Sequence, residues 1–176
     1  MGKTLLAYSL FLSSKKLSIF VTTRHESYFH DYIPVYRSVG SMINDKNNVH
    51  NKAIFVIQSR SEFYSVISAV NRLSNCNVFI DELSRWVRPQ NIEKFFEDLI
   101  VMSRPQNVNI ILMTVRPQLF GTLVISQTDV FVLFEMRCYR DIEYVGKGIG
   151  EDLGIYYPLV QFEFLIYGLM ADILQI

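Results

Sequence analysis

Short apolar runs separated by helix-forming segments recur along the whole chain, and this alternation constrains the fold more than any other feature. It predicts a mainly parallel sheet covered by helices on both faces. Half of the 176 residues are hydrophobic, which suits a sheet buried on both sides within a single domain. The expected strands are 16–22, 53–57, 77–80, 108–114, 129–135 and 159–167, and the expected helices are 5–14, 60–73, one beginning at Asn91, 117–126 (a short helix or turn) and 139–149.

The segment 23–51 does not follow this alternation. It is polar and irregular, and its length indicates a functional or partner-facing excursion. It carries His25, His30 and His50, with Asp31 nearby, which could together form a metal site. Their irregular spacing favours surface histidines instead.

The overall charge excludes a uniformly basic nucleic-acid-binding protein. Lysine plus arginine number 17, aspartate plus glutamate number 17, and the formal net charge is zero. Cys76 and Cys138 lack metal-ligand spacing, which argues against a zinc site or a disulfide framework and favours a reducing compartment. The apolar runs are too short to span a bilayer and no signal peptide is evident, so we expect a cytoplasmic protein without an integral membrane segment.

The first candidate site is at the amino terminus, where Gly2-Lys3-Thr4 leads into an apolar helix. These residues match the last three positions of the phosphate-binding motif G-x-x-x-x-G-K-[ST]. In such a loop, backbone N–H groups at the helix start point at the phosphates, the lysine adds a positive charge, and the hydroxyl ligates Mg²⁺. The three residues alone are equally compatible with a chance match.

The second candidate follows the strand 77–80, where Asp81 and Glu82 stand side by side. Ligands of parallel sheets bind at the carboxyl ends of the strands, so acids at this position are candidates for chemistry. Asp81 is a candidate ligand of the Mg²⁺ shell, and Glu82 is a candidate base for the attacking water. The alternative is that Asp81 caps the next helix.

The third candidate surrounds the strand 108–114. Thr114 ends this strand and could sense a γ-phosphate through its hydroxyl group. Arg104 precedes the strand and Arg116 follows it, and an arginine in either place could stabilise charge that develops on the phosphoryl oxygens. For each arginine taken alone, a solvated surface charge is the simpler explanation.

Taken in order, these parts resemble the HerA/FtsK group of additional-strand P-loop ATPases, which pump or package DNA. The resemblance rests on Gly2-Lys3-Thr4, on 78–82 and on 103–117, and with the following segment it covers most of 1–145. It implies a three-layer α/β P-loop NTPase fold of the RecA/FtsK type, with ATP and Mg²⁺ as cofactors.

The resemblance also implies roles for individual residues. Gly2, Lys3 and Thr4 would bind phosphate, and Thr4 and Asp81 would hold Mg²⁺. Glu82 would be the general base, and Arg104 is a better candidate than Arg116 for an arginine finger. The chain departs from the group at Val115, where a polar glutamine is usual, so the sensor role would fall to Thr114.

A second departure is that the front half of the phosphate loop, and the strand before it, do not precede Gly2. We therefore expect residues 1–176 to be one P-loop ATPase domain that is truncated at its amino terminus. In this fold the absent strand would lie between the strands 108–114 and 129–135. The last strand, 159–167, is the obvious candidate to fill that gap.

By resemblance, the expected partners are double-stranded DNA and further copies of the chain in a ring, usually a hexamer, with a capsid or membrane partner also possible. The cluster of Arg85, Trp86 and Arg88 would suit a contact with nucleic acid, although Trp86 could equally pack at a subunit interface or under a loop. The small size favours a viral genome-packaging ATPase. Alternatives are a filamentous-phage-type assembly ATPase, a non-catalytic α/β scaffold with a degenerate nucleotide site, and a small-molecule kinase, which the absence of an arginine-rich lid disfavours.

Overall fold

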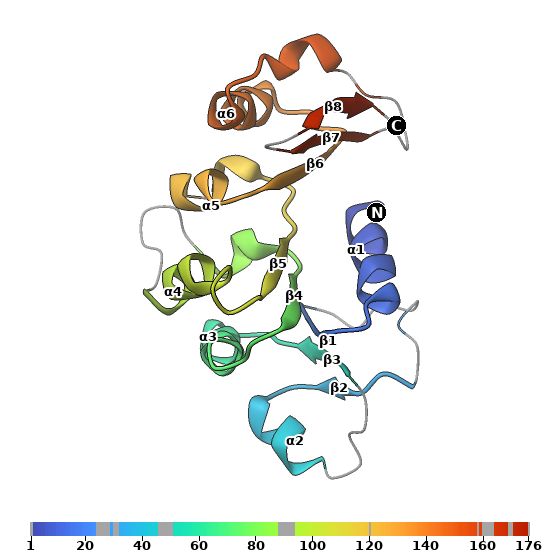
Figure 1. The fold of residues 1–176 in the computed structure, drawn as a ribbon, viewed down its shortest axis with the longest axis vertical. Helices are drawn as coiled ribbons and strands as arrows, with labels where there is room; N and C mark the ends of the chain where they lie inside the picture. Colours follow the sequence, from blue (N-terminus) through green and yellow to red (C-terminus); the bar gives the residue numbers. More distant parts are fainter. Residues whose placement is uncertain are drawn as a thin grey trace.

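The computed structural model describes residues 2–23, 29, 32–45, 51–87, 94–119, 121–157, 159, 164–168 and 171–175. Its largest feature is a five-stranded parallel sheet in the order β2-β3-β1-β4-β5 (Figure 1). The sequence predicts a mainly parallel central sheet, and all the strand pairs of this sheet are parallel. Its strands are β1 (Leu17–Thr22), β2 (Val35–Tyr36), β3 (Lys52–Val56), β4 (Cys76–Ile80) and β5 (Asn109–Leu112).

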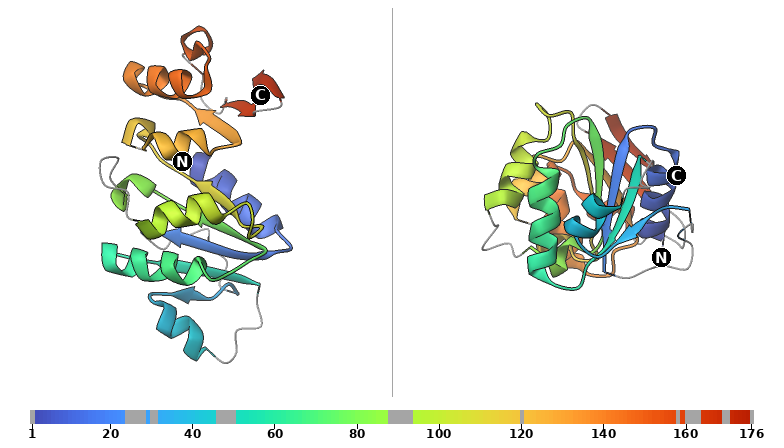
Figure 2. Two further views of the ribbon diagram at one scale, coloured as in Figure 1. Left: turned by 60° about the vertical axis from the view of Figure 1, so that its left-hand side comes forward. Right: turned by 90° about the horizontal axis from the view of Figure 1, so that it is seen from below.

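Helices cover both faces of this sheet, which gives the expected three layers (Figure 2). On one face lies α1 (Gly2–Ser13), which contributes Tyr8 and Phe11 to a core that includes Phe20 and Phe79. On the other face lie α3 (Arg60–Val70) and α4 (Lys94–Met102). The sheet is apolar on both sides because alternate residues of β1 and β4 belong to different cores.

Local sequence signals explain where several helices begin. The side chain of Ser59 accepts a hydrogen bond from the Glu62 N–H, and Glu62 reaches back to the Ser59 N–H at 3.3 Å, so the predicted capping box of α3 is confirmed. Helix α2 (Val39–Asn44) also begins with a capping box, formed by Ser38 and Ser41, in which a serine takes the place of the glutamate. The segment 23–51 is therefore less irregular than expected, since it holds both β2 and α2.

A second, antiparallel sheet follows in the order β6-β7-β8. Its strands are β6 (Val130–Phe134), β7 (Phe164–Gly168) and β8 (Ala171–Gln175). The remaining elements are η1 (Leu83–Arg85), η2 (Pro117–Leu119), α5 (Thr122–Ser126), α6 (Tyr139–Ile149) and η3 (Leu153–Tyr156). Helix α6 shares a small core with this sheet, formed by Leu133, Ile142, Val145, Leu153, Leu159 and Leu165.

The place of the last long strand corrects one expectation. Strand β7, the candidate to fill the gap between β5 and β6, instead pairs with β6 in the antiparallel direction, with Leu133 opposite Leu165. In the described part of the chain β5 pairs only with β4, and β6 pairs only with β7. The gap that the sequence predicts between β5 and β6 is thus present and has no strand in it among the described residues.

Other expected boundaries shift by a few residues. Strand β5 ends at Leu112, so Thr114 lies in the loop that follows it. Of the helix expected from Asn91, the structure describes α4 (Lys94–Met102), and residues 91–93 lie outside the described residues. Within the described residues, no helix is long and apolar enough to cross a bilayer.

Candidate functional site at the carboxyl edge of the sheet

The loops that follow β4 and β5 lie side by side at the carboxyl edge of the parallel sheet. The N–H of Leu83 donates to the carbonyl of Met113 at 3.1 Å. This hydrogen bond joins the loop that carries Asp81 and Glu82 to the loop that carries Thr114. The structure thus brings together the second and third candidate segments that the sequence analysis identified. This edge is where ligands of parallel α/β sheets bind.

Helix α1 begins at the carboxyl end of β6. The ammonium group of Lys3 lies 5.9 Å from the centre of the Phe134 ring, and Phe134 is the last residue of β6. A Cβ atom on Gly2 would lie 3.1 Å from Cε1 of the same ring, so a larger residue there would require the ring to move. The first N–H groups of α1, which have no partner within the helix, are consequently at this edge of the molecule. They and the half-buried Lys3 and Thr4 are suited to a phosphate group.

The acid pair after β4 is held in an unusual conformation. Asp81 is 7% exposed, and its N–H donates to the carbonyl of Val21. Glu82 adopts the left-handed backbone conformation, with φ 52° and ψ 47°. A non-glycine residue pays about 1 to 2 kcal/mol for this conformation, and such residues cluster at functional sites. Glu82, the residue expected to act as a base, is half-buried.

Thr114 and Arg116 form a turn after β5. The N–H of Arg116 donates to Oγ1 of Thr114 at 3.0 Å, and the Arg116 side chain is exposed. Thr114 and Lys3 both line one large cavity. The structure thus links the acid pair to the loop of Thr114, and Thr114 to Lys3 through the shared cavity, whereas Asp81 and Glu82 do not line that cavity.

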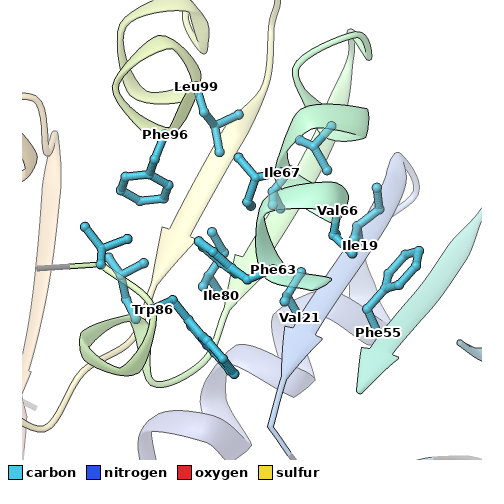
Figure 3. Close-up of a cluster of buried hydrophobic side chains, with 14 of the residues drawn as sticks. Ile19, Val21, Phe55, Phe63, Val66, Ile67, Ile80, Trp86, Phe96 and Leu99 are labelled. Atoms are coloured by element: carbon cyan, nitrogen blue, oxygen red, sulfur yellow. The ribbon is translucent and has the colours of Figure 1, made fainter. Parts of the chain in front are cut away.

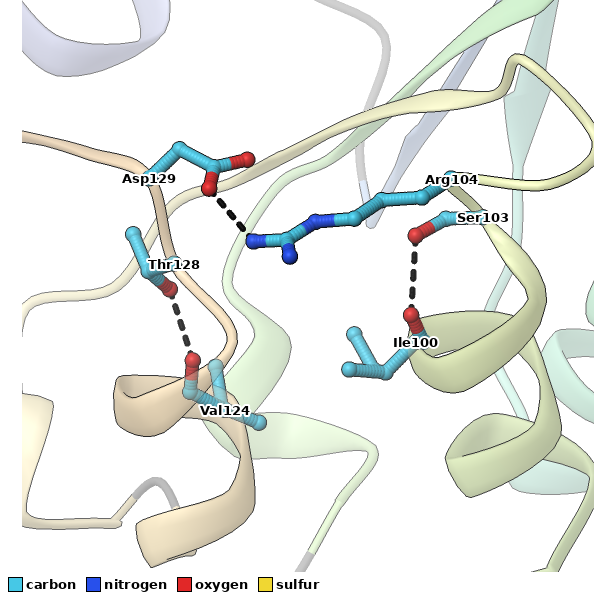
Figure 4. A network of polar contacts seen from close by, with 6 residues as sticks. All are labelled: Ile100, Ser103, Arg104, Val124, Thr128 and Asp129. Carbon is cyan, nitrogen blue, oxygen red and sulfur yellow. Dashed lines mark hydrogen bonds and ion pairs between the residues drawn. The ribbon is translucent and has the colours of Figure 1, made fainter. Parts of the chain in front are cut away.

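Arg104 is at the opposite end of the strands. It lies in the turn between α4 and β5, and its guanidinium pairs with Asp129, the residue before β6 (Figure 4). Both residues precede strands, whereas Asp81, Glu82 and Thr114 follow strands. The structure therefore does not bring Arg104 to the acid pair of its own chain.

Asp141 is a residue near the candidate site to which the sequence analysis gave no role. It is 3% exposed, and its Oδ1 accepts the N–H of Gln118 at 3.3 Å. This contact ties the loop that follows Thr114 and Arg116 to the first turn of α6, on which η2 packs. The only sequence signal for it is an acid at the third position of a helix, a common place for a structural aspartate.

Trp86 is a core side chain and is not available to stack on a base. It is 5% exposed, and its ring stacks on Phe63 with centroids 5.7 Å apart and an angle of 10° between the planes (Figure 3). Packing, the second of the two alternatives, is thus confirmed. Arg85 is exposed, and Arg88 lies outside the described residues, as do His25, His30, Asp31 and His50. Cys76 is fully buried, and this burial raises the pKa of its thiol.

Between β5 and β6 lies a cavity of about 710 Å³, which we call the β5–β6 groove. Lys3 and Phe134 mark one end of it, and Arg104 and Asp129 mark the other. Because the residues before both strands meet at one end, and Thr114 and Glu135 after both strands line the other part, β5 and β6 run in the same direction. Apolar side chains of α1, α4, α5 and α6 also line it: Leu6, Ala7, Leu10, Ile100, Val124, Ile125 and Val145.

Solved structures of viral genome packaging NTPases are among those that match this fold. The NTPase B204 from Sulfolobus turreted icosahedral virus 2, in complex with ATP-gammaS, matches with a TM-score of 0.80 at 18% identity, over 99% of this chain and 90% of that chain. The complex of the same NTPase with sulfate matches with a TM-score of 0.80 at 18% identity, over 99% of this chain and 89% of that chain. B204, the DNA-packaging ATPase from Sulfolobus Turreted Icosahedral Virus, matches with a TM-score of 0.73 at 17% identity, over 98% of this chain and 87% of that chain.

No family model matches the chain, and no curated protein sequence matches it. The structural likeness nevertheless confirms the predicted fold class. The chain has the α/β fold of P-loop packaging NTPases, with a central parallel sheet between layers of helices.

Proposed function

We propose that this chain, which has the fold of a viral packaging NTPase, is the ATPase domain of a motor that moves double-stranded DNA during genome packaging. One observation carries the proposal. The start of α1 with Lys3, the strained acid Glu82, and Thr114 are all on the carboxyl edge of the sheet. Residues suited to phosphate, to a base and to a sensor thus occur where this fold accepts ligands.

In this proposal Gly2, Lys3 and Thr4 bind the phosphates of ATP through backbone N–H groups, an ammonium charge and a hydroxyl group. The donor set fits Mg²⁺, because the Thr4 hydroxyl and the Asp81 carboxylate supply the oxygen ligands that this ion prefers. A bound Mg²⁺ would neutralise charge on the phosphate oxygens. Among the described residues no cluster of three or more histidine, cysteine, aspartate or glutamate side chains that could hold a metal ion occurs.

Glu82 is the proposed general base. Its left-handed backbone turns the chain away from the strand conformation two residues after β4, next to buried Asp81. The base would accept a proton from the attacking water as that water adds to the γ-phosphorus, while the bond from this phosphorus to the β–γ bridging oxygen breaks and ADP leaves. Thr114 would contact the γ-phosphate through its hydroxyl group, which still has a proton to donate while its oxygen accepts from Arg116.

Arg104 is proposed to act on the site of a neighbouring subunit, with Arg116 as the alternative finger. Its place at the amino-terminal end of β5 separates it from the acid pair of its own chain. An arginine finger supplied by another chain requires an assembly, and a closed ring, a hexamer by resemblance, provides every site with such a neighbour. DNA and a capsid or membrane component are the proposed further partners.

The front half of the phosphate loop is proposed to come from residues before Gly2 in a longer polypeptide. A strand there would occupy the β5–β6 groove and end at the start of α1, so residues 1–176 would be the larger part of one ATPase domain. If no such segment exists, the site has only half a phosphate loop. The non-catalytic scaffold then becomes the better interpretation, and absence of nucleotide binding would identify it.

The proposal is tested with Glu82→Gln in the longest polypeptide that the reading frame encodes. We expect ATP binding to persist and ATP hydrolysis to fall by at least about 100-fold, the usual contribution of a general base. Glu97→Gln, at an exposed glutamate on α4, is the matched control and should retain activity. Robust hydrolysis by the Glu82 variant would remove that residue from the mechanism.

A further inference from the structure

Trp86, shortly after the acid pair, is fixed both by its backbone and by its ring. The ring stacks on Phe63, the fourth residue of α3 (Figure 3). The N–H of Trp86 donates to the carbonyl of Leu83 at 2.9 Å, which closes the η1 turn whose cap residue is Glu82. Phe63 is itself fixed, because its N–H donates to the carbonyl of Ser59, the cap residue of α3. The ring of Trp86 therefore ties η1 to the start of a capped helix.

Glu82 lies between two residues that are buried and hydrogen-bonded to the sheet or its loops. Asp81 is 7% exposed, and its N–H donates to the carbonyl of Val21 in β1. Leu83 is fully buried, and its N–H donates to the carbonyl of Met113 at 3.1 Å. A residue other than glycine keeps the left-handed conformation only where the surrounding structure over-determines it. The contacts on either side of Glu82 supply part of that constraint.

The far end of the η1 turn supplies the rest of the constraint. Trp86 and Val87 are 5% and 7% exposed, and the N–H groups of both donate to the carbonyl of Leu83. Removal of the Trp86 ring would break the contact of this turn with α3. Glu82, the strained residue of the segment, would then leave the left-handed region. Its carboxylate would move with the backbone, and a general base acts only within hydrogen-bond reach of the proton that it accepts.

The indole N–H does not contribute to this anchoring. Nε1 of Trp86 is buried and has no hydrogen-bond acceptor among the described residues. A buried donor without a partner is costly, so the N–H group does not explain a tryptophan at this position. The apolar area and the stacking of the ring do explain it. A phenylalanine would retain most of the stacking and would remove the unpaired donor.

We propose that Trp86 is a positioning residue for Glu82. Its ring, stacked on Phe63, holds the η1 turn and thereby keeps the backbone of Glu82 in the left-handed conformation. Trp86 itself contacts neither the nucleotide nor the attacking water. The inference deepens the proposed function and rests on it, since Glu82 is the proposed general base. The coupling of the Trp86 ring to the backbone of Glu82 can be measured without ATP.

The first test measures kcat and KM for ATP in the longest polypeptide that the reading frame encodes. Trp86→Leu should lower kcat at least about tenfold and leave KM within about twofold, because the base is displaced while the phosphate-binding residues of α1 are unchanged. Trp86→Phe should restore most of the lost kcat. Phe96→Leu is the matched control and should retain kcat. Phe96 is fully buried in the same core, and its ring centre lies 6.2 Å from that of Phe63, but it belongs to α4.

The second test is a cycle of urea denaturations, which needs no ATP. Circular dichroism follows unfolding, because Trp86 is the one tryptophan of the chain. Glycine adopts the left-handed conformation freely, so Glu82→Gly should raise the urea midpoint when Trp86 is present. In the Trp86→Leu background the same replacement should give a smaller gain or none, since Glu82 is no longer held in the strained conformation. Asn75→Gly, at φ 53°, is the control and should have the same effect in both backgrounds.

Phe63→Leu removes the same stack from the side of α3 and replaces Trp86→Leu in both tests if that variant does not fold. Three results would overturn the inference: an unchanged kcat in the folded variant without the stack, an equal fall of kcat in Phe96→Leu, or equal gains from Glu82→Gly with and without the Trp86 ring. Continued ATP hydrolysis by Glu82→Gln would instead overturn the proposed function. The denaturation cycle would then still decide whether Trp86 holds the backbone of Glu82.

Discussion

Arg104 pairs with Asp129 at the end of the β5–β6 groove opposite to Lys3. Asp129 directly precedes β6, and Arg104 lies in the turn before β5. Local hydrogen bonds fix the backbone near each of them. The Val108 N–H donates to the Ser103 carbonyl at 2.8 Å, and Thr128 Oγ1 donates to the Val124 carbonyl at 2.6 Å. The pair therefore joins the two sheets at one edge, while the candidate nucleotide site is at the other.

Replacing Arg104 by alanine tests whether its role is structural or catalytic. The side chains of Arg104 and Asp129 are 61% and 63% exposed, and exposed pairs contribute little to stability. We expect Arg104→Ala to lower the free energy of unfolding by less than about 1 kcal/mol in a denaturant titration, and to abolish ATP turnover by the assembled motor.

An experiment that mixes subunits then tests whether Arg104 acts on the nucleotide site of a neighbouring subunit. Subunits with Arg104→Ala and subunits with Lys3→Ala should be inactive alone and partly active together, because some interfaces then combine an intact lysine with an intact arginine. Arg116→Ala is tested in the same mixture. If neither arginine variant is rescued, no finger is assigned to this chain.

Replacing Glu82 by glycine should raise stability. The left-handed backbone at φ 52° costs a glutamate about 1 to 2 kcal/mol, and glycine adopts it freely but loses more entropy on folding. The expected net gain in unfolding free energy is about 0.5 to 1 kcal/mol, together with loss of ATP hydrolysis. Asn75→Gly, at φ 53°, is the control that should show no gain, since asparagine tolerates this conformation and Asn75 also accepts a hydrogen bond from Asn107. A loss of stability in the Glu82 variant would show that its side chain has a structural role.

Removing the buried carboxylate of Asp141 should loosen the loop after β5. Asp141→Ala leaves the Gln118 N–H without its acceptor and should cost about 1 to 3 kcal/mol of unfolding free energy. Asp141→Asn retains an oxygen that can accept this bond, so its loss should be smaller. Chemical denaturation of the three proteins measures both values, and equal losses in the two variants would assign the effect to the charge instead.

Stability should fall at alkaline pH because of Tyr36. Burial and a hydrogen bond from its hydroxyl to Asp45 at 2.9 Å raise the pKa of Tyr36 to about 12. The unfolded chain loses this proton near pH 10 and the folded chain near 12, so stability present below pH 10 declines as the pH rises from 10 to 12. Tyr36→Phe should flatten this decline. Burial also raises the pKa of Tyr157 to about 12, so part of the decline should remain, and an unchanged slope would contradict the assignment.

The parts of the fold that depend on local patterns could be predicted from the sequence. Apolar runs gave the four longer strands of the parallel sheet, and Ser59 with Glu62 marked the start of α3. The positions of β7 and Trp86 depend on tertiary contacts instead. The apolar run of β7 is compatible with either strand direction, and an indole beside two arginines is equally consistent with a core or a surface until Phe63 is seen stacked on it.

The candidate site was predictable to the same extent. Strand ends identified Asp81, Glu82 and Thr114, because carboxyl ends of parallel strands share one edge. The backbone strain at Glu82 and the contact of Asp141 with Gln118 have no sequence pattern, since each results from how distant segments meet.

Equilibrium binding of Mg²⁺-ATP decides whether α1 and the acid pair form an ATP site. The measurement compares this chain with a version extended before Gly2 in its genomic reading frame, each as wild type and as Lys3→Ala. We expect the extended wild-type chain to bind ATP and its Lys3→Ala variant not to bind it. If none of these proteins binds ATP, with each shown to be folded, α1 and the acid pair do not form an ATP site.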